Sequence, residues 1–574
     1  MANPNRRDTL NTAPFDEALE RLAVGKTAWV ATTTAGRIAL LQAVRARLAD
    51  HAEEWVTLAG EAKGLPASSP LLGEEWASGP WALLVGIDLL IRTLGKVDGR
   101  RHLDGISVRS TRSGQTAARV FPLSWVDRLL LSGVEAEVWM EPGVLPQTLR
   151  TETASAYASP RGPGRVALVL GAGNITAIAP LDAIHKLFAE HSVALIKLNP
   201  VLERLKPVFD AIFEPLIAAG YLAIVNGGAD AGAYLTNHRL VETMHITGSI
   251  ASHDAIVFGT GREGAERKAA AQPLNPRPIT SELGAVGPAI IVPGNWTKAD
   301  LRFQAEHIAT QKLHNSGFNC IAAQVVVMSR DWPLADAFLA ELRRAIADAP
   351  ARPAYYPGAP DRMDAFQAAH PTAERIGGHR TRRLVATIDA DAVDQLFETE
   401  IFGPALGIVL LPHSEPAAFL EHAIAFANKR LHGTLGANIL IDPRTEKALG
   451  DRFEDLVADL HYGTIAINAW SGLGFLLSHV PWGAFPGHPI EDAQSGRGVV
   501  HNGFLFDRPE RSIVRAPFRP APRGLLHGSF AVLPRPPWFV TNRTAATTLR
   551  RMFAYQLRPS LLRLLGVLTS AVRG

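Results

Sequence analysis

The sequence feature that most constrains the fold is an alternation of short apolar runs and amphipathic segments between residues 165 and 249. Apolar runs typical of buried strands lie at residues 166–170, 193–197, 222–225 and 244–249, and helical spacing of apolar residues fills 178–189 and 201–219. This alternation is typical of parallel strands joined by crossover helices. The sequence therefore predicts a doubly wound α/β sheet, which binds ligands at the carboxyl ends of its strands.

The segments on either side predict further organisation. A second α/β region is expected at residues 282–482, with strands at 289–292, 323–328, 407–411, 437–441 and 464–468. Residues 14–131 show mainly helical spacing. Residues 132–164 are predicted to form a β-hairpin that leaves the domain, with a turn at 160–164, and the Gly- and Pro-rich residues 481–498 are predicted to form a loop.

Composition narrows the class of protein. The chain has 574 residues, 47% of them hydrophobic and 20% charged, which is ordinary for a globular protein. One cysteine excludes a disulfide framework. The first residues contain no apolar run of the signal-peptide type, and residues 81–91 are too short to span a bilayer. We therefore expect a cytoplasmic protein, with peripheral membrane association as the alternative.

Charge is divided unevenly along the chain. The net charge is +3, but eleven Arg and no Asp, Glu or Lys follow Glu510, so residues 1–510 carry a net of −8. The last segment places apolar residues on one helical stripe flanked by arginines: Leu561, Leu564, Leu565, Leu568 and Val572, with Arg558, Arg563 and Arg573 beside them. We expect it to dock on the acidic body or on a sister subunit, and contact with a membrane interface is the alternative. No aromatic platform or motif points to nucleic-acid binding.

The only cysteine, Cys320, lies at a predicted helix-to-strand junction within residues 311–324. A lone cysteine is more often an inert core residue than a nucleophile, so its context has to decide. Polar or glycine residues that suit a ligand stand at the ends of predicted strands: Asn174, Lys197 and the pair Gly248 and Ser249. The GxGxxG fingerprint of ordinary dinucleotide-binding domains is missing after these strands.

Taken in order, several short motifs resemble the aldehyde dehydrogenase superfamily. They are Gly173-Asn174 followed by Lys197, His245-Ile-Thr-Gly-Ser, Ser281-Glu-Leu-Gly, Gly317-Phe-Asn-Cys320, Glu400-Ile-Phe-Gly-Pro, Gly463-Thr-Ile-Ala-Ile-Asn468, Pro481-Trp-Gly and Ser495-Gly-Arg. Each is weak alone, but their shared order over some 330 residues is a strong signal. The resemblance covers roughly residues 15–517 and not the tail.

The resemblance implies a chemistry for three residues. Cys320 would be the nucleophile that attacks an aldehyde, and Asn174, with the Cys320 backbone N–H, would stabilise the oxyanion. Hydride would leave to NAD or NADP, and Glu282 would activate the water that hydrolyses the thioester. The implied function is NAD(P)-dependent oxidation of an aldehyde, which we expect to be hydrophobic, to the acid.

The resemblance also implies a cofactor site. Lys197 would reach the adenosine ribose, Gly248 and Ser249 the pyrophosphate, and Glu400 and Phe402 the nicotinamide ribose and ring. Pro200 stands where many NAD-preferring members have Glu, which makes NADP tolerable, and Glu203 one turn later is a candidate substitute. No metal site is expected, since one Cys and scattered His form no ligand cluster.

The implied fold is that of aldehyde dehydrogenases: two doubly wound α/β domains with bridging β-strands and an extra basic helical tail. Cofactor binding is expected from residues 1–131 and 165–281, catalysis from 282–482, bridging and assembly into a homo-oligomer (dimer or tetramer) from 132–164 and 503–517, and the tail from 518–574. The strand at 511–515 is expected to join a neighbouring subunit's sheet.

Three alternatives stay open. Leu170-Gly-Ala-Gly-Asn-Ile also resembles NADPH-dependent fatty acyl-CoA reductases of the same superfamily, although the presence of Glu282 favours hydrolysis. A non-catalytic member would not need the combination of Cys, Asn and Glu. A Cys-His hydrolase built on Cys320 and His314 has only the short sequence spacing in its favour.

Overall fold

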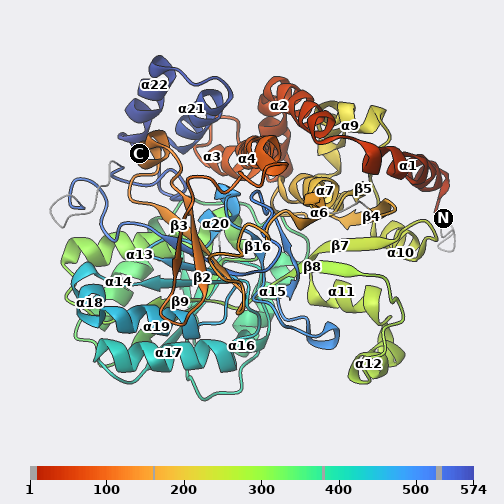
Figure 1. Cartoon of the computed structure of the whole chain (residues 1–574). Helices are drawn as coiled ribbons and strands as arrows, with labels where there is room; N and C mark the ends of the chain where they lie inside the picture. The colour runs from red at the N-terminus through yellow and green to blue at the C-terminus, as the bar shows by residue number, and fades with distance from the viewer. Residues whose placement is uncertain (1–9, 159–161, 378–381, 525–532) are drawn as a thin grey trace.

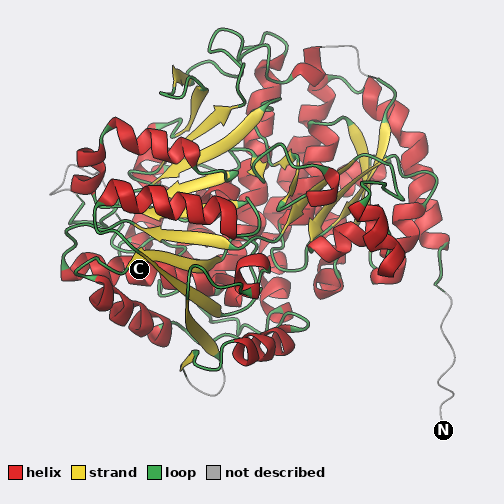
Figure 2. Ribbon diagram, turned by 90° about the horizontal axis from the view of Figure 1, so that it is seen from below, coloured by secondary structure: helices red, strands yellow, loops and turns green. Residues whose placement is uncertain are grey.

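Two large β-sheets organise the chain, each lying between helices (Figure 2). The computed structural model describes residues 10–158, 162–377, 382–524 and 533–574. The first sheet has the strand order β17-β8-β7-β4-β5-β6, and all of its strands run parallel except β17. Its strands are β4 (Arg165–Leu170), β5 (Ser192–Lys197), β6 (Leu222–Val225), β7 (Thr243–Gly248), β8 (Ile279–Leu283) and β17 (Gly496–Arg497). The predicted doubly wound sheet is confirmed.

Helices cover both faces of this sheet, so β5 is buried along its whole length and its apolar run is continuous (Figure 1). The helices that contact its strands include α1 (Ala13–Ala31), α7 (Ile178–Phe188), α10 (Ala229–Asn237) and α11 (Ile250–Val257). Helix α2 (Thr34–Ala62) packs on other helices, and α12 (Gly261–Ala269) packs on α11. The single helix predicted at 201–219 is wrong. Pro207 and Pro215 divide it into η2 (Pro200–Leu205), α8 (Lys206–Ile212) and α9 (Glu214–Ala218), because proline cannot donate a helical hydrogen bond.

The second sheet has eleven strands in the order β1-β2-β3-β19-β15-β14-β9-β10-β13-β12-β11. Its central strands are β9 (Gly287–Ile291), β10 (Ala323–Ser329), β13 (Ala405–Leu411), β14 (Gly436–Leu440) and β15 (Thr464–Ile467), close to their predicted positions. The strands of one edge are β11 (Glu374–Ile376) and β12 (Arg383–Ile388). The main helices are α13 (Lys298–Leu313), α14 (Ala335–Asp348), α15 (Ala359–Ala369), α17 (Pro416–Arg430), α18 (Pro443–Leu449), α19 (Asp451–Asp459) and α20 (Gly472–Leu477).

The other edge of this sheet corrects three predictions. Strands β1 (Ser107–Ser110) and β2 (Thr116–Phe121) lie in the region predicted to be helical, because pairing with a neighbouring strand overrides the helix propensity of their alanines. Instead of a hairpin at 132–164 there is one strand, β3 (Glu135–Met140), followed by loops and α6 (Ser155–Ala158); part of the predicted turn, residues 159–161, lies outside the described residues. Strand β19 (Pro509–Arg515) pairs with β3 and with β15 of its own chain, not with a neighbouring subunit's sheet.

The predicted loop at 481–498 contains only the short elements β16 (Trp482–Gly483), η4 (Ile490–Asp492) and β17, and β16 pairs with β18 (Val499–Val500).

One described helical stretch, Leu72–Val97, is long and apolar enough to cross a membrane, and 83% of its most apolar window is buried within the protein. It consists of α3 (Leu72–Trp76), a π-type turn (Ala77–Trp81) that contains Pro80, and α4 (Ala82–Val97). This burial is typical of a core helix.

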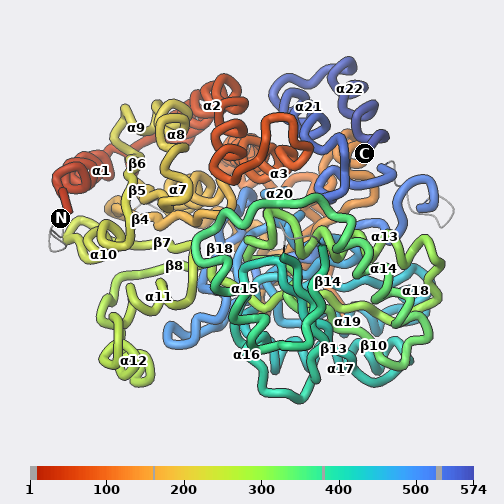
Figure 3. The backbone as a smooth tube through the Cα atoms, turned by 180° about the vertical axis from the view of Figure 1, so that it is seen from behind, coloured from red at the N-terminus to blue at the C-terminus, as the bar shows by residue number. Residues whose placement is uncertain are grey.

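The C-terminal tail forms two helices: α21 (Ala545–Leu557) lies beside α3, and α22 (Leu561–Ala571) packs on α21 (Figure 3). Tail arginines pair with acidic side chains of the body: Arg519 and Arg523 with Asp300, and Arg535 with Glu306. Arg550 pairs with Glu53 in the same way. The opposite charges of tail and body therefore meet within the chain.

Candidate active site

A sharp backbone turn presents Cys320. Helix α13 ends at Leu313, and three consecutive residues, Asn315, Ser316 and Gly317, have φ angles of 53°, 61° and 81°. A Cβ on Gly317 would lie 2.7 Å from the carbonyl carbon and oxygen of Gly403, so only glycine fits there. Non-glycine residues in the left-handed backbone conformation cost conformational free energy, and they cluster at functional sites. The turn places Cys320 immediately before β10, at the predicted helix-to-strand junction.

The Cys320 thiol donates a hydrogen bond to Glu282, with 3.0 Å between Sγ and Oε1. Burial and the neighbouring Glu282 charge raise the pKa of Cys320 well above its usual value. Burial also raises the pKa of Glu282, against the hydrogen bond from Cys320 that lowers it. The thiol is therefore protonated at rest and has an acceptor for its proton in contact.

A cavity opens onto both groups. Its walls are mainly aromatic and aliphatic side chains, with a few polar ones at the reacting end. The lining includes Ser78, Ile175, Ile178, Glu282, His314, Asn319, Cys320, Ile321, Trp470, Phe475, Leu476 and Trp482. A concave apolar site with a few convergent polar groups is typical of small-molecule sites.

Asn174 lies against the same turn. It is 4% exposed, and its side-chain N–H donates to the Phe318 carbonyl at 3.2 Å. Asn315 donates in turn to the Asn174 carbonyl at 3.0 Å and to the Phe318 carbonyl at 2.8 Å. An amide has two donors, so one N–H of Asn174 is left for another acceptor.

A buried ion pair behind the turn was not foreseen from the sequence. Arg352 binds both carboxylate oxygens of Glu74, and Glu74 Oε2 also accepts the Asn315 backbone N–H at 2.9 Å. Burial raises the pKa of Glu74, but the charges of Arg352 and His314 and the hydrogen bonds from Arg352 and Asn315 together outweigh it, so the pKa ends below its usual value. Glu74 and Arg352 are 241 and 37 positions from Asn315 in the sequence, so no local sequence pattern could predict their contact with the turn.

His314 does not pair with Cys320 within the described part of the chain. Its ring packs on Trp470 with 4.7 Å between centroids, and its Nε2 lies 3.9 Å from Glu74 Oε1. Burial lowers the pKa of His314 to about 4, so it is neutral at physiological pH. The Cys-His interpretation is therefore wrong for this geometry, in which Glu282 is the group in contact with the thiol.

The predicted cofactor residues of the first sheet stand at the carboxyl ends of its strands. Lys197 ends β5 and is 9% exposed; burial lowers its pKa, while the charges of Glu203 and Asp230 raise it. Glu203 Oε1 accepts the Gly227 N–H at 3.2 Å. Ser249 caps α11 and Gly248 is exposed, so the first turn of that helix offers N–H groups suited to a phosphate.

Glu400 supplies the clearest test of the fit to a dinucleotide. Its Oε1 is buried without a hydrogen-bond partner, and its Oε2 packs so closely that a Cβ on Gly284 would lie 2.0 Å away. Burial raises the pKa of Glu400 to about 8, against the charge of Lys312, whose own pKa burial lowers to about 7. An unpartnered carboxyl oxygen suits a ribose hydroxyl. The residues present therefore fit NAD(P).

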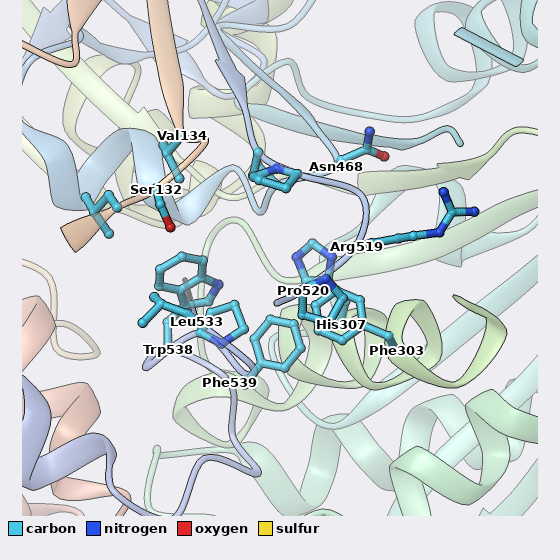
Figure 4. Close-up of a pocket in the computed structure, with 15 residues that line it drawn as sticks. Ser132, Val134, Phe303, His307, Asn468, Arg519, Pro520, Leu533, Trp538 and Phe539 are labelled. Carbon is cyan, nitrogen blue, oxygen red and sulfur yellow. The ribbon is translucent and has the colours of Figure 1, made fainter. Parts of the chain in front are cut away.

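Phe402 stands beside that carboxyl in an aromatic cluster, 4.9 Å from Tyr356 and 5.7 Å from Phe318 between ring centroids. Another cavity lies elsewhere, between the tail and α13. Figure 4 shows His307, Phe303, Trp538 and Phe539 around it. It contains none of the predicted site residues, so the chemistry belongs to the cavity at Cys320.

Comparison with known proteins finds relatives of one kind. The family model described as "Aldehyde dehydrogenase family" matches residues 206–357. The chain is 24% identical over 436 residues to coniferyl aldehyde dehydrogenase of a Pseudomonas species, which covers 69% of this chain and 80% of that protein. It is 25% identical over 379 residues to mouse aldehyde dehydrogenase family 3 member A2, with 63% and 69% covered.

Solved structures show the same fold. The NADP-dependent glyceraldehyde-3-phosphate dehydrogenase of Bacillus halodurans, complexed with NADP, superposes with a TM-score of 0.57 at 18% identity, over 88% of this chain and 92% of that one. A Sinorhizobium meliloti NAD-dependent aldehyde dehydrogenase superposes equally, at 0.57 and 18%, over 89% and 88%. The chain is thus similar, in sequence and in fold, to NAD(P)-dependent aldehyde dehydrogenases.

Proposed function

We propose that this protein oxidises an aldehyde to the carboxylic acid with NAD(P)+ through a thioester on Cys320. The observation that carries the proposal is the 3.0 Å contact between Cys320 Sγ and Glu282 Oε1 inside an apolar cavity. NAD(P)+, when bound, accepts the hydride. Lys197, Gly248, Ser249, Glu400 and Phe402 would hold it. On this proposal residues 1–131 and 165–281 serve cofactor binding and 282–482 serve catalysis.

Glu282 takes the thiol proton, and the thiolate attacks the aldehyde carbon. The second N–H of Asn174 and the Cys320 backbone N–H then stabilise the oxyanion; one such donor is typically worth about 3 kcal/mol in the transition state. After oxidation, Glu282 gives up the thiol proton and then takes a proton from the water that hydrolyses the thioester. A buried carboxylate with a raised pKa suits both proton transfers.

The substrate is proposed to be hydrophobic. Trp470, Phe475 and Trp482 line the cavity beside Cys320, together with Ile175 and Ile178. Aromatic and aliphatic walls gain free energy from burying apolar surface, about 25 cal/mol per Å². We expect aliphatic or aromatic aldehydes to be turned over with a lower KM than small hydrophilic ones.

The test is absorbance of the reduced nicotinamide with purified protein, NAD+ or NADP+, and a panel of aldehydes. Wild-type protein should give aldehyde-dependent signal, and Cys320→Ala none. Glu282→Gln should slow turnover by about 10²- to 10⁴-fold, the usual worth of a general base, and accumulate acyl-enzyme visible by intact mass. Silence with aldehydes but consumption of NADPH with long-chain acyl-CoA would favour the reductase alternative.

Two partner proposals accompany this function. Helix α22 buries Leu564 and Val567 but leaves Leu561, Leu562 and Leu565 74%, 83% and 56% exposed. Among the described residues Arg558, Arg563 and Arg573 make no ion pair. An apolar face edged by such cations suits an anionic membrane surface.

The test is co-sedimentation with anionic vesicles. Wild-type protein should bind, and the double variant Leu562→Ser/Leu565→Ser should not. Val24→Ser is the control, because Val24 is 81% exposed elsewhere on the protein, and this variant should bind like wild type.

The second partner is another copy of this chain, as a dimer or tetramer. Strand β1 ends the eleven-stranded sheet and offers unpaired backbone groups to a subunit contact. Light scattering after size-exclusion chromatography should give a mass of two or four chains. A mass of one chain at micromolar concentration would contradict this proposal.

A further inference from the structure

A polar stripe on α7 runs from the Cys320 cavity to the surface. Ile178 lines that cavity, Asp182 and Lys186 follow on the helix at intervals of four residues, and Glu190 lies two residues beyond the helix end at Phe188. Residues four apart lie on one face of a helix. The side chains of Asp182 and Lys186 are 0% and 1% exposed, whereas that of Glu190 is 32% exposed. The stripe thus carries ionisable groups from the interior to solvent.

A second polar row faces the stripe from the sheet. In the parallel register, His245 of β7 is opposite Thr280 of β8, and Thr247 is opposite Glu282. Because side chains alternate along a strand, these four project from the same face. The base Glu282 is therefore the last member of a row that His245, Thr247 and Thr280 continue.

Hydrogen bonds join the row to the stripe. Thr247 Oγ1 donates to Asp182 Oδ2 at 3.1 Å, and His245 Nε2 lies 3.2 Å from Thr247 Oγ1. The other nitrogen, His245 Nδ1, lies 2.9 Å from Thr280 Oγ1. Lys186 Nζ donates to Thr280 Oγ1 at 3.0 Å and to Glu190 Oε1 at 2.7 Å. Each neighbour within this chain is within hydrogen-bonding distance of the next.

The remaining step runs from Glu282 to Thr247. Their strands are neighbours, so their Cα atoms are about 4.8 Å apart. The Oε1 of Glu282 binds Cys320, while its Oε2 is buried without a partner. Rotation of the carboxyl group toward Thr247 connects the base to the chain once the thiol no longer holds it.

The Asp182 carboxylate, in the buried part of the stripe, lies between two histidines. Asp182 lies 3.4 Å from His245 and 3.5 Å from His501. Burial raises the pKa of Asp182, but the charges of the two histidines lower it below its usual value. An ionised Asp182 stabilises an imidazolium beside it, and an imidazole can accept a proton on one nitrogen and release one from the other.

We propose that Thr247, Asp182, His245, Thr280, Lys186 and Glu190 form a proton path from the base Glu282 to solvent. The proposal rests on the proposed function. In thioester hydrolysis the water oxygen bonds to the carbonyl carbon, the C–S bond breaks, and Cys320 leaves as thiolate. One water proton goes to Glu282 and the other stays on the acid. The path carries the Glu282 proton to Glu190, which restores the carboxylate for the next turnover.

The test removes one oxygen from the path. Thr280→Val keeps the side-chain shape but breaks the link between His245 and Lys186, whereas Thr280→Ser keeps the hydroxyl. With aldehyde and NAD(P)+, the full-length Thr280→Val protein should form its first equivalent of NAD(P)H at the wild-type rate. Later turnovers should be slower by about tenfold or more, which is less than the rate acceleration that a general base usually supplies. Thr280→Ser should restore the wild-type steady state.

Two further measurements separate proton transfer from packing. Hydroxylamine, which attacks thioesters without a general base, should restore the later turnovers of Thr280→Val. Lys186→Gln should behave like Thr280→Val, and Lys206→Gln, which removes an equivalent i,i+4 pair with Asp210 at the surface, should match wild type.

Wild-type steady-state turnover in Thr280→Val, or equal slowing of its first and later turnovers, would overturn the path alone. No rescue by hydroxylamine or by Thr280→Ser would do the same. If wild-type protein forms no NAD(P)H with any aldehyde, the proposed function fails first, and the path fails with it.

Discussion

Removal of the Arg352 guanidinium should destabilise the protein strongly and with a specific pH dependence. Glu74 and Arg352 are a buried pair with side chains 6% and 7% exposed, and Glu74 also accepts the Asn315 N–H that precedes Cys320. In Arg352→Met the carboxylate stays buried without its cation. Breaking a buried pair in this way typically costs about 3–5 kcal/mol of unfolding free energy.

The sign of the pH dependence follows from the pKa of Glu74. In wild type this pKa lies below its usual value, so the pair's stabilisation is present at neutral pH and is lost as pH falls through the folded value. In Arg352→Met burial acts alone and raises the pKa. The variant is then least stable, relative to wild type, near about pH 8, and the difference shrinks toward about pH 5 as Glu74 takes up a proton.

Urea unfolding followed by tryptophan fluorescence at both pH values measures this difference. Arg343→Met is the matched control, because Arg343 and Glu374 form an equivalent two-bond pair with side chains 37% and 45% exposed, for which we expect about 0–1 kcal/mol. The double variant Arg352→Met/Glu74→Gln should recover part of the loss. A loss no larger than the control's, or one that is equal at the two pH values, would refute the reasoning.

Three further predictions concern the turn, the tail and the cofactor. Gly317→Ala should lower the free energy of unfolding by about 1–2 kcal/mol through the positive φ alone, and by more through contact of the new methyl group with Gly403. We expect a lower melting temperature and loss of NAD(P)H formation. A melting temperature equal to that of wild type would contradict the geometry. The pKa of Asp300 is about 2, because its hydrogen bonds with Arg519 and Thr297 and the Arg519 charge together outweigh burial. Its stabilisation of the tail should therefore be complete above about pH 4 and be lost as the pH falls through about 2; limited proteolysis should cut the tail of Asp300→Asn already at neutral pH. Glu203→Gln removes a carboxylate near Lys197, so the ratio of kcat/KM for NADP+ over NAD+ should rise; an unchanged ratio would place Glu203 outside the ribose site.

The sequence by itself determined the elements whose signals are local. The alternation at 165–249 predicted β4 to β7 within a residue or two, because a strand covered on both faces must be apolar along its length. The motif around Cys320 and Glu282 identified the superfamily, since nucleophile and base are each part of a short segment with fixed residue types. The resemblance implied a role for each residue, and the fold supplies the contact between the two, which are 38 positions apart.

Only the tertiary structure decided what depends on distant segments. No sequence pattern indicates that Glu74 and Arg352 form a pair. The helix propensity of Ala117 and Ala118 disfavours a strand, but pairing with β3 stabilises one there. The stripe from Asp182 to Glu190 was visible only as polar residues in a helix; the register of β7 and β8 made it face His245 and Thr280. Strand register and side-chain contact are set by the packing of the whole chain, so residues far apart in sequence acquire a joint role only when the fold brings them together.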